Sequence, residues 1–160
     1  MLITDPQSPD FNSYASVDDL NKFSLARELA LPDNPESILI KAMDYLNGLS
    51  WYGSRVSVSQ PLPWPRSGVV FDGVKLPVDV IPSQLKTAQC MLAIEAIGGD
   101  LLASSREAAV KSERVEGAIT TVFAIADGEA FSASYPMVDG VLNGLVSGKG
   151  FAINAIARRT

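Results

Sequence analysis

Trp51-Tyr52-Gly53-Ser54-Arg55 opens the least generic stretch of this 160-residue chain, which continues as Gln60-Pro61-Leu62-Pro63-Trp64-Pro65-Arg66-Ser67-Gly68. The stretch holds both tryptophans of the chain and three of its ten prolines. Prolines lock φ and cannot donate a backbone hydrogen bond, so this composition is typical of an extended segment anchored by large rings. We therefore predict a docking loop here.

Two interpretations of the anchoring residues stay open at the level of the sequence. The two tryptophans can cover the open end of a small core, with Arg55 and Arg66 stacking on them or capping helix carboxyl ends. Alternatively, Trp64 and Arg66 lie at a subunit boundary, because Trp and Arg are enriched among the residues that dominate interfaces. The two interpretations are compatible for different atoms of the same side chains.

The amino-acid composition limits the kinds of catalysis and binding that the chain can perform. The chain is 47% hydrophobic, which suits one domain with a core. It has no histidine and one cysteine, Cys90, so Ser-His-Asp catalysis, Cys-His catalysis and ordinary zinc sites are excluded. Neither a secretory signal nor a membrane-length apolar run is visible, and synthesis in the cytoplasm is expected. Thirteen basic against eighteen acidic residues give a net charge of −5, which opposes an extended nucleic-acid footprint.

The carboxylates and glycines form no catalytic or phosphate-binding pattern. Asp44, Glu95 and Asp100 lie nearest the apolar helices, but no fixed spacing pairs two of them as acid and base. The glycines at 98–99 and 144–150 lack the order that phosphate cradles need, and they indicate helix ends. We expect no enzyme activity, no cofactor and no metal site.

Three helices are predicted before residue 100. A capping box at Ser16 starts a helix over about 17 to 30, which Pro32 stops. Pro35 at a first helical position starts the second, whose apolar residues recur at three- and four-residue spacing up to Leu49. The third begins near Pro82 and ends at the glycines 98–99.

The remainder of the chain predicts a hairpin, a last helix and a tail. Two short strands broken near Gly117 are expected within 109–123, and Pro136 opens a helix that Gly148 closes. The predicted fold class is mainly α: a small helical bundle, with a short β-hairpin inserted before the last helix and an extended C-terminal tail. The apolar tail, 149–160, is either a core-packing segment or a partner-docking arm.

The order of several motifs resembles a tailed-bacteriophage family known as DnaT-like. The resemblance covers roughly residues 10–148, and its most specific part is the Trp-Pro-Arg-x-Gly stretch at 64–68. The other matching segments are Asn12 to Asp19, Ala42 to Leu46, Trp51 to Arg55, Val80 to Lys86, Ala109 to Val115 and Tyr135 to Asp139. The tail does not align with the family, which divides the chain into a connector domain at 1–148 and a docking arm at 149–160.

The resemblance implies a head-tail connector, or adaptor: a virion structural protein in the neck, in a cyclic homo-oligomer of twelvefold symmetry under the portal. Implied partners are further copies of itself, the portal protein and a downstream tail protein, with DNA only as passing cargo and no membrane contact. The interface candidates are Trp51, Arg55, Trp64, Arg66, Phe151, Ile153, Ile156, Arg158 and Arg159.

The alternative function is single-stranded DNA binding in replication, which the family label suggests. On that alternative, Trp51, Tyr52 and Trp64 stack on bases while Arg55 and Arg66 contact phosphates. The acidic net charge and the lack of a long basic groove argue against it, because such proteins combine stacking platforms with a positively charged track.

Overall fold

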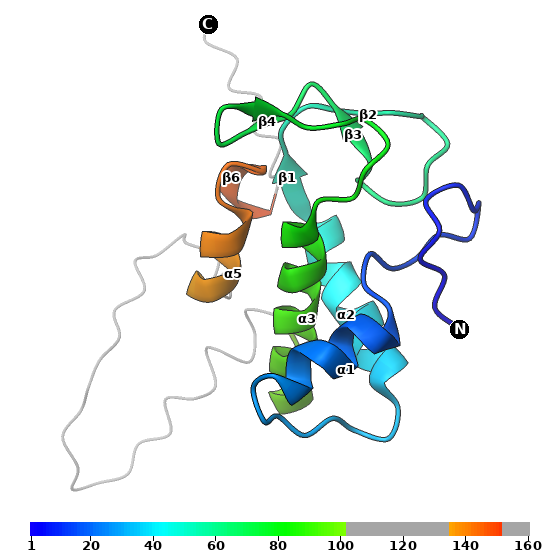
Figure 1. Cartoon of the computed structure of the whole chain (residues 1–160), viewed down its shortest axis with the longest axis vertical. Helices are drawn as coiled ribbons and strands as arrows, with labels where there is room; N and C mark the ends of the chain where they lie inside the picture. The colour runs from blue at the N-terminus through cyan, green and yellow to red at the C-terminus, as the bar shows by residue number, and fades with distance from the viewer. Residues whose placement is uncertain (102–134, 152–160) are drawn as a thin grey trace, which may run out of the picture.

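The computed structural model describes residues 1–101 and 135–151 of the chain. Within these ranges, four helices form one half of the molecule, and short antiparallel strands lie at one end of the helices (Figure 1). The helices are α1 (Val17–Leu25), α2 (Pro35–Asn47), α3 (Ser83–Gly98) and α5 (Pro136–Leu142). We call these helices and their core the helical half.

Three two-stranded antiparallel sheets occur in the described residues. β1 (Leu49–Trp51) pairs with β6 (Val146–Phe151), β2 (Ser54–Arg55) with β3 (Arg66–Ser67), and β4 (Val70–Phe71) with β5 (Val74–Lys75). The prediction of a mainly α bundle with a single hairpin is therefore wrong, and the fold mixes α and β. Strands β2, β3, β4 and β5 have two residues each and are too short to show an alternating apolar pattern, which is why the sequence did not reveal them.

Helix α3 is the centre of the core and packs against α1, α2 and α5. Its buried residues include several alanines, which allow close approach of the neighbouring helices. One contiguous apolar cluster joins these helices to both tryptophans, Trp51 in β1 and Trp64 just before β3. The helical half and the strands therefore share a single core.

Helix starts follow the sequence closely. The predicted capping box of α1 is present: the Asp19 N–H donates to Ser16 Oγ at 3.0 Å, and the Ser16 N–H donates to Asp19 Oδ2 at 2.9 Å. Pro35 occupies the first turn of α2, although the Asn34 side chain makes no capping bond. The third helix also begins and ends as predicted, one residue after Pro82 and at Gly98.

Two helix ends differ from the prediction. The first helix stops at Leu25 rather than near residue 30, because Glu28 takes a left-handed φ of 54° and the Leu29 N–H turns back to Ser24 O. The last helix stops at Leu142 rather than at residue 148, because Gly144 has a φ of 88° that a helix cannot contain. A strand, β6, then begins two residues later instead of a continued helix.

Two predictions concern residues outside the described ranges. The hairpin expected within 109–123 and the tail beyond 151 both lie there. Strand β6 itself runs across the boundary predicted at 148/149 and pairs Phe151 with Leu49.

Candidate functional site

Residues 52–81 form a surface that we call the β-rich end, drawn above the helices in Figure 1. Every residue from 52 to 59 is exposed, as are most residues from 72 to 80. Tyr52 keeps 49% of its surface exposed, and it lies just before β2. Several apolar side chains here also face solvent: Val56, Val58, Val70, Val74, Val78 and Val80.

Two arginines face each other on the β2–β3 ladder. Arg55 and Arg66 are Cα partners in this antiparallel pair, and like charges placed directly opposite one another destabilise a ladder. Among the described residues, neither arginine forms an ion pair with a carboxylate. Partial burial and the neighbouring Arg55 charge lower the pKa of Arg66 below its ordinary value. The pair therefore concentrates positive charge that the described part of the protein does not neutralise.

The two guanidinium groups are used differently. Arg66 donates to four backbone carbonyls: Nε to Tyr52 O at 2.7 Å, Nη2 to Gly53 O at 2.7 Å and Trp51 O at 3.4 Å, and Nη1 to Pro63 O at 3.1 Å. Arg55 makes one such bond, from Nη1 to Gln60 O at 2.9 Å, and its side chain is exposed. Within the described ranges, Arg55 is therefore the arginine whose guanidinium keeps unused N–H donors.

Both tryptophans lie inside the core. Trp64 is 0% exposed and Trp51 is 8% exposed, and their rings meet edge to face with centroids 6.1 Å apart. Tyr14 packs there too, and its hydroxyl accepts the backbone N–H of Trp64 at 3.3 Å. Burial raises the pKa of the Tyr14 phenol, so it stays neutral. The structure therefore leaves neither indole free to stack on a base or to anchor a partner.

Charge is unevenly distributed between the two parts of the molecule. Residues 1–50 carry eight acidic and three basic side chains, whereas the β-rich end carries three basic (Arg55, Arg66, Lys75) and two acidic ones (Asp72, Asp79). The acidic net charge of the whole chain therefore does not describe the β-rich end. An anionic ligand meets less repulsion there than at the helical half.

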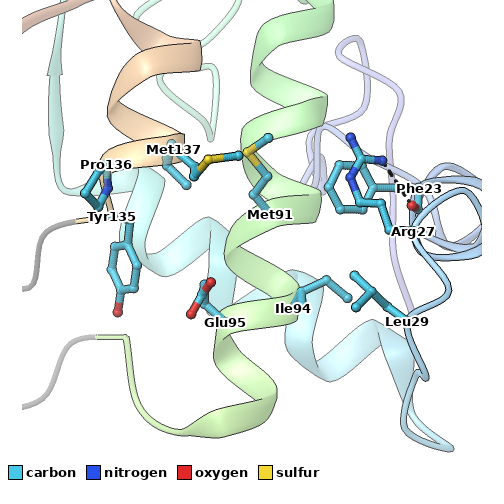
Figure 2. A pocket seen from close by; sticks show the side chains of 10 residues that line it. Phe23, Arg27, Leu29, Met91, Ile94, Glu95, Tyr135, Pro136 and Met137 are labelled. Atoms are coloured by element: carbon cyan, nitrogen blue, oxygen red, sulfur yellow. Dashed lines mark hydrogen bonds between the residues drawn. The ribbon is translucent and has the colours of Figure 1, made fainter.

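A concave surface lies on the helical half, between the end of α1, the middle of α3 and the start of α5 (Figure 2). It has a volume of about 440 Å³ and is mostly apolar, with Phe23, Leu29, Met91, Ile94 and Met137 among its lining residues. Its charged groups are one cation, Arg27, and one carboxylate, Glu95. With one positive and one negative group in an apolar lining, this groove suits an apolar partner better than a polyanion.

Arg27 is already engaged at the rim of this groove. Its guanidinium carbon lies 3.7 Å from the centroid of the Phe23 ring, and Nη1 donates to Phe23 O at 3.1 Å (Figure 2). Such stacking is a common use of arginine beside an aromatic ring. The groove is therefore a separate feature from the cationic β-rich end.

The structure brings together only some of the residues that the sequence singled out. Arg55 and Arg66 are adjacent, with Tyr52 beside them, while Trp51 and Trp64 support them from within. Phe151 belongs to β6, and the remaining candidates, Ile153, Ile156, Arg158 and Arg159, lie outside the described residues.

Lys75 and Phe71 were missed, although a local signal for them exists. Asp72-Gly73 is a dipeptide typical of tight hairpin turns, and both residues have positive φ, 50° and 78°. Recognising this turn would have predicted the β4–β5 hairpin that carries Phe71 and Lys75.

Neither a cluster of metal ligands nor a membrane-spanning helix occurs in the described ranges. Residues 1–101 and 135–151 contain no group of three or more His, Cys, Asp or Glu residues arranged to hold a metal ion. No helix among them has the length and apolar character needed to cross a bilayer.

The comparisons with known proteins give one finding. A family model described as "Putative DnaT-like ssDNA binding protein" matches residues 1–160. No curated protein and no solved structure matches the chain. The match corrects the expected partners: it points to single-stranded DNA as a partner, and it gives nothing for a portal-bound ring, a phage neck or DNA as mere cargo.

Proposed function

This chain belongs to the DnaT-like ssDNA binding protein family, and from that membership we propose that it binds single-stranded DNA through its β-rich end. The function proposed is binding without catalysis. The observation that carries the location is the cross-strand pair of Arg55 and Arg66, in which Arg66 binds the backbone carbonyl of the exposed Tyr52.

The side chains of the β-rich end match the two parts of a DNA single strand, its bases and its phosphates. Single-stranded nucleic acids are held by aromatic rings that stack on bases and by cations that follow the phosphates. Tyr52 supplies an exposed ring, and Arg55 supplies an exposed guanidinium with unused donors. A phosphate bound to Arg55 would also offset the repulsion between the two arginine charges.

Lys75 is an exposed cation on the β4–β5 hairpin, and Phe71 is a partly buried aromatic ring on the same hairpin. Phe71 lies over Gly144: a Cβ placed on that glycine would be 3.5 Å from the Phe71 ring. The ring therefore rests on the backbone between α5 and β6, which limits its freedom to move toward a ligand.

Fluorescence anisotropy with a labelled oligothymidylate tests the proposal. We expect salt-dependent binding, and we expect Arg55→Ala to reduce the salt slope by about 0.7, the contribution of one phosphate contact on a single strand. Tyr52→Ala should weaken binding by about 1–3 kcal/mol, while Tyr52→Phe keeps the ring and most of the affinity.

Lys41→Ala is the matched control, because Lys41 is an exposed cation on α2 in the helical half. Equal losses from Lys41→Ala and Arg55→Ala would show that binding is diffuse and would reject the β-rich end as its location. A wild-type protein that fails to bind oligothymidylate at low salt would reject the function itself.

A further inference from the structure

Arg66 is almost fully occupied by the protein's own backbone. An arginine has five N–H groups, one on Nε and two on each terminal nitrogen. Four of the five are directed at carbonyl oxygens: those of Trp51, Tyr52, Gly53 and Pro63. Only one N–H, on Nη1, has no such acceptor, so Arg66 cannot offer the two-pronged contact that arginine makes with a phosphate.

Its four acceptors come from two separate segments. Three are consecutive carbonyls at the turn from β1 into β2, and the fourth, at Pro63, belongs to the proline-rich segment that leads into β3. The first three acceptors lie 13 to 15 residues before Arg66 in the sequence, and Pro63 lies three residues before it. One side chain thus ties the turn that carries Tyr52 to the segment that carries the buried Trp64.

Besides Arg66, the turn is held by the Tyr52 N–H, which donates to Leu145 O at 3.0 Å, and by the short β2–β3 ladder. Strands β2 and β3 are two residues long, and the residues from 52 to 59 are all exposed. An isolated two-stranded ladder is marginal in water, so the direction of the Tyr52 and Arg55 side chains depends on how the backbone is held.

We propose that Arg66 is a positioning residue for the DNA-binding surface: it fixes the Trp51–Gly53 backbone so that Tyr52 and Arg55 are presented together, and Arg55 is the arginine that contacts phosphate. This inference rests on the proposed function. From the sequence, Arg55 and Arg66 have the same candidate roles. The inference makes Arg55 the phosphate ligand and Arg66 the residue that holds the backbone.

Lysine distinguishes the two roles. A lysine keeps the positive charge, but its single ammonium group cannot reach four carbonyls from two directions as the planar guanidinium does. A phosphate ligand acting mainly through charge should tolerate this change, whereas a backbone tie should not.

The experiment compares Arg55→Lys, Arg55→Ala, Arg66→Lys and Arg66→Ala by oligothymidylate anisotropy over a range of salt concentrations. We expect Arg55→Lys to stay within about threefold of the wild type, and Arg66→Lys to lose about tenfold, the equivalent of one well-placed contact. Arg66→Lys should leave the salt slope unchanged, and Arg55→Ala should reduce it by about 0.7.

Two results would overturn the assignment. One is wild-type affinity in Arg66→Lys, which would make charge the whole contribution of this side chain. The other is a fall in salt slope in Arg66→Ala that matches that of Arg55→Ala, which would make Arg66 a phosphate ligand itself.

A second readout needs no DNA and separates failure of this inference from failure of the proposed function. Trp51 is buried and its carbonyl is bound by Arg66, so acrylamide quenching of tryptophan fluorescence should increase in Arg66→Lys and stay unchanged in Arg55→Lys. Unchanged quenching in Arg66→Lys would reject the positioning role, whether or not the wild-type protein binds oligothymidylate. Arg66→Lys is the deciding variant because it keeps the charge and most of the volume, so it is expected to fold even if Arg66→Ala does not.

Discussion

The helical half and the β-rich end are held together by different interactions. In the helical half, apolar side chains from four helices interlock, and one buried amide, that of Gln89, satisfies the backbone around it. In the β-rich end, many apolar side chains face solvent, and a partly exposed arginine bonds the backbone instead. The comparison shows that the exposed part of the β-rich end is ordered by polar contacts to the main chain, in addition to the few side chains that this end buries, such as Trp64 and Val69.

The largest expected effect tests the role of Gln89 in the helical half. Its Oε1 accepts the N–H groups of Tyr14 and Ala15 at 3.0 and 2.7 Å, and its Nε2 donates to Ser13 Oγ and Leu39 O at 2.8 and 3.0 Å. Gln89→Leu leaves the buried N–H groups of Tyr14 and Ala15 without this acceptor, so we expect a loss of about 3–5 kcal/mol in the free energy of unfolding by urea.

Gln84→Leu is the matched control for this substitution, because Gln84 lies on the same helix and is only partly buried. It should change stability by less than about 0.5 kcal/mol. Similar losses for the two variants would mean that the buried amide does not organise the helical half.

The next effect concerns the turn that carries Tyr52. Gly53 has a φ of 72°, and a Cβ there would lie 2.3 Å from Ser67 O and 2.6 Å from Val69 Cγ2. We expect Gly53→Ala to cost about 3 kcal/mol, from the strained φ together with this overlap. Gly73→Ala separates the two causes: Gly73 has a similar φ of 78° but nothing within 4 Å of the added carbon, so it should cost about 1 kcal/mol in the same urea experiment.

The same contrast explains how much the sequence could predict. Helices α2 and α3 were found from apolar periodicity and from proline and glycine at their ends, because each extends over several turns. The β-rich end has strands of two residues, and its main tie, Arg66, bonds carbonyls 13 to 15 residues away. A carbonyl is present in every residue, so no residue pattern marks the acceptors. The sequence singled out Arg55 and Tyr52 as candidates together with Trp51 and Trp64. Only the structure shows that the first two are exposed and that the two tryptophans are buried.

A smaller effect is expected at the start of α1, where the charge of Asp19 stabilises the helix. Partial burial opposes ionisation of this carboxyl, but hydrogen bonds from Ser16 and the charges of Lys86 and Lys22 outweigh it and lower its pKa below 3.8. A lowered pKa in the folded state means that the stabilisation is present above pH 3.8 and is lost as the pH falls through the folded-state value.

Asp19→Ala should therefore cost about 1 kcal/mol at pH 7, the usual loss for a helix cap, and the difference from the wild type should shrink below about pH 4. Asp18→Ala is the control: Asp18 lies in the same helical turn but makes only an exposed ion pair with Lys22, so it should cost about 0.3–0.5 kcal/mol. Urea unfolding at about pH 7 and pH 3 measures both, and a pH-independent loss in Asp19→Ala would contradict the capping role.

The smallest expected effect concerns two adjacent valines of the β-rich end. Val69 is 0% exposed and belongs to the shared core, whereas Val70 is 58% exposed. If this end is ordered by contacts to the main chain, Val70→Ala should change the free energy of unfolding by no more than about 0.5 kcal/mol. Val69→Ala removes the same atoms from the core and should cost about 2 kcal/mol. A comparable loss at both positions would mean that the exposed valines are buried against something in the folded protein, and the difference drawn between the two parts of the molecule would fail.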